Sequence, residues 1–288
     1  MTLMTTLLGP LAALVLATDV MAKAPAVGTV LLAPTEIILP RSGLVAAEEG
    51  LLIVPENRAV PGSRRIAVHF WRFRGRQPAA APVVVLPGGP GSAVTRGPGR
   101  AYSGGYPGLE SPWGERLIEG LAAGGDLLFV NQRGNANASL QAGLRFVDGR
   151  PLALDRVPAE TEIAQAARDQ MEASLAPWPG RGVDLRGYDF PNIVEDLEDL
   201  RLALGYERLK LHGGSFGSQW ALGYLKRHPD RVDRAVLTGI EPLDYSYDSP
   251  AWVWTAIKRL AAAIDADPAW RGEFPQGVLA ARGEVPRR

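Results

Sequence analysis

The chain has 288 residues, 46% of them hydrophobic, and its 31 basic residues are balanced by 31 acidic ones. This size suits one large domain or two small ones, and the lack of a basic run argues against binding to a nucleic-acid backbone. Cysteine is absent, which excludes disulfides, a thiolate nucleophile and cysteine-ligated metal sites. Histidine-dependent chemistry has three candidates, His69, His212 and His228.

The first 24 residues are set apart by an apolar run over 7–17 that ends near the small residues Ala22 and Ala24. This pattern is typical of a secretory signal peptide, although no lysine or arginine precedes the run. Its eleven residues are too few to cross a bilayer, so no stable membrane span is expected. The prediction is export to the periplasm or the medium, and a cytoplasmic protein with an apolar leader is the alternative.

From about residue 48 onwards, strands and helices alternate, as in a doubly wound sheet. Two strands, 50–55 and 65–71, flank a Pro-Gly turn and are expected to form an antiparallel hairpin. The short apolar runs 83–86 and 126–130 are typical of strands buried on both faces. The elements predicted further along the chain are a helix near 159–173, a helix over 191–204, a strand over 209–211, a helix over 216–227, a strand over 235–240 and a helix over about 251–264. Asp189 and Asn192 are capping candidates for the helix over 191–204, and Gly205 is its expected stop. Ser249 is the expected N-cap of the last helix, with Pro250 at its first position.

A G-x-S-x-G motif runs through Gly213, Ser215 and Gly217, between a predicted strand and a predicted helix. A nucleophile on such a turn has strained backbone with no room for neighbouring side chains, so glycine is needed two residues before and two after it. The helix that follows directs its N-terminal amides and its positive dipole end towards charge that develops on a substrate. The motif therefore predicts Ser215 as a nucleophile, and a glycine-rich turn with an incidental serine is the alternative.

A second glycine-rich segment, Pro87-Gly88-Gly89-Pro90-Gly91, directly follows the strand 83–86. Stabilisation of an oxyanion needs two backbone N–H donors, one on the residue after the nucleophile, here Phe216, and one on a loop after an earlier strand. Gly88 and Gly89 are candidates for the second donor, because glycine lets a substrate carbonyl approach the main chain closely. A phosphate-binding loop is the competing interpretation, but the lysine and Ser/Thr pair of such loops does not follow.

A third segment, Asn131-Gln132-Arg133-Gly134, follows the strand 126–130. In order and spacing, the three segments resemble the α/β-hydrolase serine peptidases of the proline iminopeptidase and tripeptidyl aminopeptidase type, and the resemblance covers about residues 48–264. Where that family usually carries D-x-R-G-x-G-x-S, this chain has Asn131 and then the run 135–139, so a carboxylate and a glycine are missing from the loop.

The resemblance implies specific site residues and an activity. Ser215 would be the acyl-forming nucleophile, Gly88, Gly89 and Phe216 would form the oxyanion hole, and the enzyme would release residues from unblocked peptide N-termini. Glu241 lies just past a predicted strand, on the carboxyl edge where ligands bind in such sheets. It is a weaker candidate for pairing with the terminal ammonium of a substrate, and a solvated loop acid is the alternative.

The catalytic acid and the histidine of this fold are expected after the nucleophile, but only His228 follows Ser215. His228 is thirteen residues further along a predicted helix, about 20 Å down its axis, and is interpreted as a helix terminus. His212 is about 10 Å back in the preceding strand, and His69 belongs to the first hairpin. No base is therefore assigned, and the later acidic residues fall where the family inserts its cap.

The predicted organisation is an apolar leader over 1–24, an α/β-hydrolase core with a doubly wound, mostly parallel sheet over 48–243, and the start of a helical cap over 244–288. Six strands of an expected eight are recognised, so the fold is predicted to be incomplete at its C-terminus and the chain to be a poor hydrolase on its own.

The predicted function is that of a serine aminopeptidase acting on peptides through Ser215. An esterase-like or lipase-like hydrolase with a small ester substrate is one alternative, and a non-catalytic remnant or binding module is the other. No cofactor, metal or nucleic-acid partner is expected, and the oligomeric state is left open.

Overall fold

The computed structural model describes residues 25–91, 93, 112–121, 123–134, 160–244, 250–270 and 273–281. The chain divides into two compact units, 1–240 and 241–288, and each is described by itself. The predicted leader over 1–24 and the run 135–139 lie outside the described residues.

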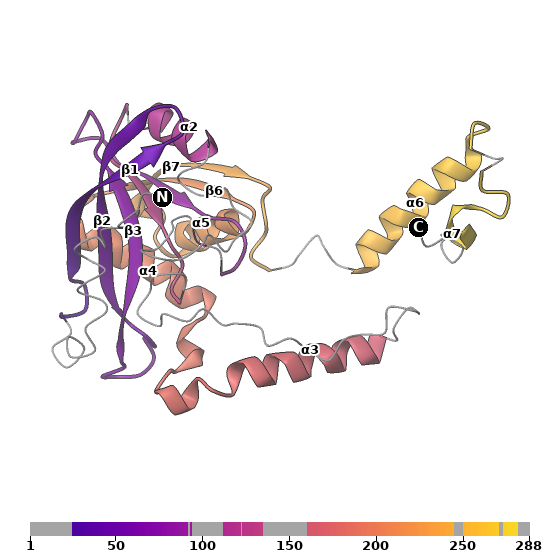
Figure 1. Ribbon diagram of the computed structural model, residues 1–288, viewed down its shortest axis with the longest axis horizontal. Helices are drawn as coiled ribbons and strands as arrows, with labels where there is room; N and C mark the ends of the chain where they lie inside the picture. The colour runs from indigo at the N-terminus through magenta and orange to yellow at the C-terminus, as the bar shows by residue number, and fades with distance from the viewer. Residues whose placement is uncertain are drawn as a thin grey trace, which may run out of the picture. The chain divides into compact units, whose positions relative to one another are not determined.

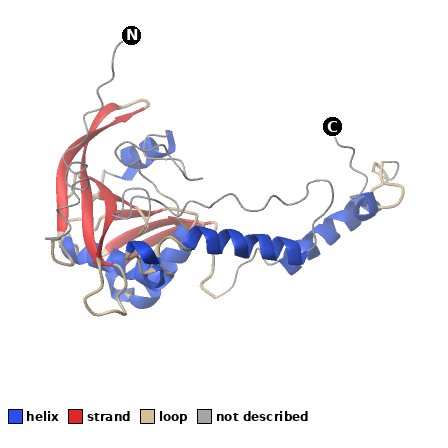
Figure 2. Ribbon diagram, turned by 60° about the horizontal axis from the view of Figure 1, so that its bottom comes forward, coloured by secondary structure: helices blue, strands red, loops and turns tan. Residues whose placement is uncertain are grey.

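Within the described residues, the first unit is built on a seven-stranded sheet in the order β1-β2-β3-β5-β4-β6-β7. Figure 1 labels the strands, and Figure 2 shows the twist of the sheet. The first four strands in this order are antiparallel neighbours, whereas β5, β4, β6 and β7 run parallel. The strands are β1 Val30–Leu39, β2 Gly43–Pro55, β3 Arg65–Phe73, β4 Val83–Leu86, β5 Leu127–Val130, β6 Leu209–Gly214 and β7 Val232–Thr238.

Helices pack on both faces of this sheet (Figure 1). On one face, Leu197 of α4 and Trp220 of α5 join the core cluster that includes Leu86 of β4. On the other face, Ile118 of α2 packs with Phe129 of β5. The α-helices are α2 Pro112–Leu121, α3 Glu160–Leu175, α4 Phe190–Ala203, α5 Phe216–Arg227, α6 Pro250–Ala266 and α7 Val278–Ala281, and the short 3-10 helices are η2 Pro179–Arg181, η3 Leu185–Gly187 and η4 Pro229–Arg231.

The doubly wound α/β arrangement predicted from the sequence is confirmed. Because helices cover both faces, β4 and β5 are almost entirely buried, which is the reason for their continuous apolar runs. The start of α4 also follows its predicted signals, since the Asp189 carboxylate accepts a hydrogen bond from the Asn192 N–H at 2.8 Å. Gly205 follows the helix with a φ of +73°, as expected of a left-handed C-terminal stop.

The prediction of six strands was wrong, because the described residues form a seventh, β1. This edge strand alternates between exposed and partly buried positions and contains Pro34, which is tolerated at a sheet edge but weakens the strand pattern in the sequence. β2 begins at Gly43, seven residues earlier than predicted, because its first half pairs with β1. β6 extends to Gly214, where it pairs with Thr238 of β7.

The described part of the second unit consists of α6 and α7. α6 begins at Pro250, which agrees with the predicted proline in the first helical turn. No helix in the described ranges of the chain is long and apolar enough to cross a bilayer.

Candidate active site

Ser215 occupies the sharp turn between β6 and α5. Its backbone has φ of +52° and ψ of −130°. Among the described residues, all others with a positive φ are glycines. The Ser215 N–H donates to the carbonyl of Thr238 at 3.0 Å. The Ser215 carbonyl accepts from the N–H of Ser218 at 2.8 Å and from the Ser218 hydroxyl at 2.6 Å. These bonds hold a strained backbone conformation whose side chain is exposed.

The two glycines that flank Ser215 are required by close backbone contacts. A Cβ atom added at Gly213 would lie 2.4 Å from the carbonyl oxygen of Gly217, and one added at Gly217 would lie 2.1 Å from the carbonyl oxygen of Leu86. Backbone atoms cannot move aside as a flexible side chain can, so neither position accepts a larger residue. The physical reason for the motif, a turn too crowded for neighbouring side chains, is therefore present in the structure.

The loop over 87–91 begins beside this turn. β4 and β6 are parallel neighbours and Leu86 is paired with Gly213, so the chain leaves both strands at the same edge of the sheet. Phe216, the first residue of α5, is buried, and its ring packs edge-on against Phe190 with 6.0 Å between centroids. The fold thus brings together Ser215, Phe216 and the loop that carries Gly88 and Gly89, as the sequence predicts.

A buried glutamine clamps the same loop. Gln132 lies two residues after the end of β5. Its side-chain oxygen accepts from the Gly91 N–H at 2.7 Å, and its side-chain nitrogen donates to the Gly89 carbonyl at 3.0 Å. The sequence singled out the segment 131–134 without giving Gln132 a role. The strand order supplies it, because β5 lies next to β4 and the residues that follow the two strands meet.

The segment after β5 is anchored by a buried ion pair. Arg133 is fully buried, and its Nε and NH2 groups donate to the two carboxylate oxygens of Asp196 on α4 at 2.7 and 2.5 Å. Its NH1 group donates to the backbone carbonyls of Glu56 and Gly187, at 2.6 Å each. Arg58 donates to the same Asp196 at 2.6 Å. One guanidinium therefore ties the β2–β3 hairpin, the loop after β5 and α4 together.

The three histidines occupy separate parts of the first unit. His69 is buried on β3, three strand positions from β6 or roughly 14 Å, and its ring contacts Glu49 at 2.7 Å and Asn131 at 3.3 Å. His228 caps the far end of α5 beside Glu195. His212 is half-buried on β6, and burial lowers the pKa of its imidazole below the ordinary value. These places agree with the positions expected from the sequence: the first hairpin for His69, the strand before the nucleophile for His212 and a helix terminus for His228.

The candidate Glu241 lies three residues after the end of β7. Glu241 is half-buried and begins the second unit. Among the described residues, no group of three or more histidine, aspartate or glutamate side chains has the arrangement of a metal site.

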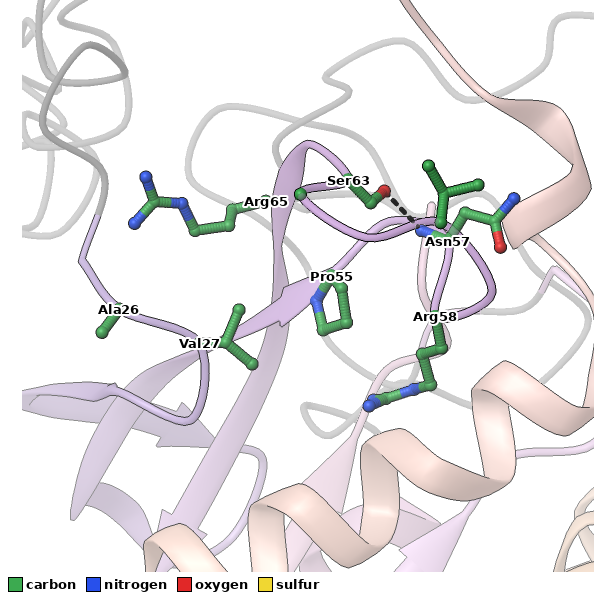
Figure 3. Close-up of a pocket in the computed structure, with 9 residues that line it drawn as sticks. Ala26, Val27, Pro55, Asn57, Arg58, Ser63 and Arg65 are labelled. Carbon is green, nitrogen blue, oxygen red and sulfur yellow. Dashed lines mark hydrogen bonds between the residues drawn. The ribbon is translucent and has the colours of Figure 1, made fainter.

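A separate pocket of about 620 Å³ is formed by the β2–β3 hairpin and the chain before β1 (Figure 3). The Ser63 hydroxyl accepts from the Asn57 N–H at 2.9 Å on one wall. Arg58, on another wall, is paired with Asp196 and Asp199, so its charge is neutralised from within the protein. Since β5 and β4 separate this hairpin from β6, the pocket is not part of the site around Ser215.

The chain matches the model of the α/β hydrolase fold over residues 81–282, and it belongs to that family. It is 47% identical over 49 residues to a proline iminopeptidase of Xylella fastidiosa, which covers 17% of this chain and 16% of the relative. It is 26% identical over 200 residues to the serine protease Hip1 of Mycobacterium tuberculosis, which covers 66% of this chain and 35% of the relative. The chain therefore spans about a sixth to a third of these curated relatives.

A crystal structure described as a probable hydrolytic enzyme from Pseudomonas aeruginosa is also similar. It shares 15% sequence identity and has a TM-score of 0.38, and the match covers 66% of this chain and 40% of that one. Family membership defines the fold and the general class of hydrolases.

Proposed function

We propose that this chain carries the nucleophile and the oxyanion hole of a serine peptidase that acts on peptides with a free N-terminus. The observation that carries the proposal is the strained Ser215, exposed on a strand-turn-helix connection beside the loop with Gly88 and Gly89. Strain of this kind is retained where it serves a site. The two relatives named as peptidases support a peptide substrate.

The proposed reaction is acyl transfer. The Ser215 Oγ attacks the scissile carbonyl, and the oxygen that gains negative charge accepts hydrogen bonds from the N–H of Phe216 and from the N–H of Gly88 or Gly89. The C–N bond then breaks, the amine leaves with a proton, and water later hydrolyses the ester on Ser215. The positive dipole end of α5 points at the same oxygen and stabilises its charge.

The serine proton needs a base. All three histidines of the chain lie among the described residues, on β3, on β6 three residues before Ser215, and at the far end of α5. None of these positions puts an imidazole next to the exposed hydroxyl. We therefore expect slow acylation by these 288 residues alone, with turnover requiring a base supplied from outside them.

The test is labelling with a fluorophosphonate probe, which reacts with activated serines. We expect slow labelling of the purified chain, none in Ser215→Ala, and unchanged labelling in Ser63→Ala, because Ser63 belongs to the β2–β3 hairpin. A folded wild-type chain that is not labelled would contradict catalysis by this chain and would favour the non-catalytic binding module.

The substrate class is tested by a matched pair of substrates. An aminoacyl naphthylamide with a free amine should acylate Ser215 faster than its N-blocked form, because the proposal requires recognition of the terminal ammonium. Equal rates would favour an esterase-like enzyme.

Export is also part of the proposal, on the strength of the apolar run over 7–17. N-terminal sequencing of the protein from cell fractions tests it. Cleavage after Ala22 in the exported fraction is the expected result, because Pro25 disfavours a cut after Ala24, and an intact N-terminus in the cytoplasm would contradict it.

A further inference from the structure

The three glycines of the loop over 87–91 have little intrinsic preference for one conformation. Gly89 and Gly91 both have positive φ, at +75° and +79°, and glycine populates such conformations as readily as ordinary ones. A chain of three glycines and two prolines therefore needs contacts from elsewhere to keep its N–H groups pointing in one direction.

The Gln132 side chain supplies those contacts. It is 2% exposed, and its planar amide spans the loop from the carbonyl of Gly89 to the N–H of Gly91. A primary amide offers a donor and an acceptor on one flat group at this length, whereas an ionised glutamate lacks the donor, and methionine lacks the donor and has only a weakly accepting sulfur. The contact therefore matches the residue type and not merely its size.

The base of this clamp is itself rigid. The N–H of Asn131 donates to the carbonyl of His69 at 3.0 Å, and Arg133 is locked to Asp196. Both neighbours of Gln132 are thus fixed by bonds to other elements. Within the described residues, the N–H groups of Gly88 and Gly89 donate to no backbone carbonyl, so the clamp orients the loop without using either candidate for the second oxyanion donor.

We propose that Gln132 is a positioning residue that holds the loop over 87–91 so that the N–H groups of Gly88 and Gly89 face the carbonyl attacked by Ser215. This inference rests on the proposed function of Ser215. Gln132 does not touch the reacting atoms, and its effect passes through the backbone of Gly89 and Gly91.

Two near-isosteric variants test the inference. Gln132→Met removes donor and acceptor, and Gln132→Glu keeps the acceptor but sets a carboxylate against the carbonyl of Gly89. Gln165→Met, on the exposed surface of α3, is the matched control. The three measurements are hydrogen exchange of the Gly91 amide by NMR, the rate of fluorophosphonate labelling of the folded chain, and the melting temperature.

We expect Gln132→Met to speed exchange of the Gly91 amide by about tenfold, as the loss of one hydrogen bond implies, and to slow labelling roughly 10- to 100-fold, as for a misplaced catalytic group. Labelling of Gln132→Glu should be slower than that of the wild type at pH 8. As the pH is lowered, the variant's rate should approach the wild-type rate measured at the same pH. A protonated carboxyl again offers a donor to Gly89 and an acceptor to Gly91. A merely structural role would not produce this recovery.

Wild-type exchange and labelling in Gln132→Met would overturn the inference, as would a lower melting temperature with an unchanged labelling rate of the folded protein. If the wild-type chain is not labelled at all, the proposed function fails, and hydrogen exchange then decides about the clamp alone. Faster exchange of the Gly91 amide in Gln132→Met would support the contact of Gln132 with the loop, and unchanged exchange would contradict it.

Discussion

The Cα of Gly217 lies directly against the carbonyl group of Leu86, so that a Cβ at position 217 would stand 2.1 Å from the Leu86 oxygen. This contact joins the first turn of α5 to the end of β4. It sets the distance between the residue after the nucleophile and the glycine-rich loop, which are the two proposed sources of oxyanion donors.

The first prediction follows from this contact. Gly217→Ala should destabilise the protein by about 1 to 3 kcal/mol, because neither backbone segment can move aside without straining the core. Chemical unfolding in urea measures the change. Gly120→Ala is the matched control, since Gly120 is in α2 and a Cβ there meets open space; it should stabilise the protein by roughly 0.5 to 1 kcal/mol. Equal stability of the two variants would contradict the crowding argument.

The second prediction concerns the strain at Ser215, whose φ is +52°. Glycine adopts such a backbone freely, whereas alanine does not. Ser215→Gly should therefore be more stable than Ser215→Ala by about 1 kcal/mol. Thermal unfolding of the two variants in the same buffer checks this. If alanine proves as stable as glycine, the turn stores no strain and the argument for a functional site loses its main support.

The third prediction tests the anchor beneath the loop after β5. Arg133→Met should lower the free energy of unfolding by about 3 to 5 kcal/mol, because it leaves the buried carboxylate of Asp196 without its bidentate partner. Arg186→Met is the control, since Arg186 pairs with Asp184 at the exposed surface, where ion pairs contribute little. Urea unfolding of both variants measures the difference. Similar losses of stability in the two variants would show that burial does not determine how much an ion pair contributes to stability.

The fourth prediction is a pH dependence. Burial lowers the pKa of His212 in the folded protein below its ordinary value of 6.5, so the unfolded chain binds a proton at a higher pH than the folded one. Stability therefore falls as the pH drops below about 6.5. His212→Gln should lose less stability than the wild type between pH 7.5 and 5.5, as measured by urea unfolding at each pH.

Lys210→Gln is the matched control for His212, because position 210 lies two residues earlier on the same face of β6 and the variant leaves the imidazole in place. It should keep the wild-type slope of stability against pH. A wild-type slope in His212→Gln would show that other groups produce the pH dependence.

The sequence predicted the features that depend on neighbouring residues. The apolar runs of β4 and β5, the capping aspartate of α4 and the turn around Ser215 each follow from local pattern and backbone chemistry, and the structure forms all of them. β1 was missed because its alternation is weak and Pro34 interrupts it, and it becomes a strand by pairing with β2 over its whole length.

Only the tertiary structure decided the contacts between segments that lie far apart in the chain. The segment Asn131–Gly134 was recognised as a motif, but the clamp of Gln132 on Gly89 and Gly91 appears only once β5 is known to lie beside β4. The pairing of Arg133 with Asp196 likewise joins residues 63 positions apart. Local patterns reflect what each stretch of backbone needs for itself, whereas such partners depend on the order of strands in the sheet, which the burial of every strand and helix determines together.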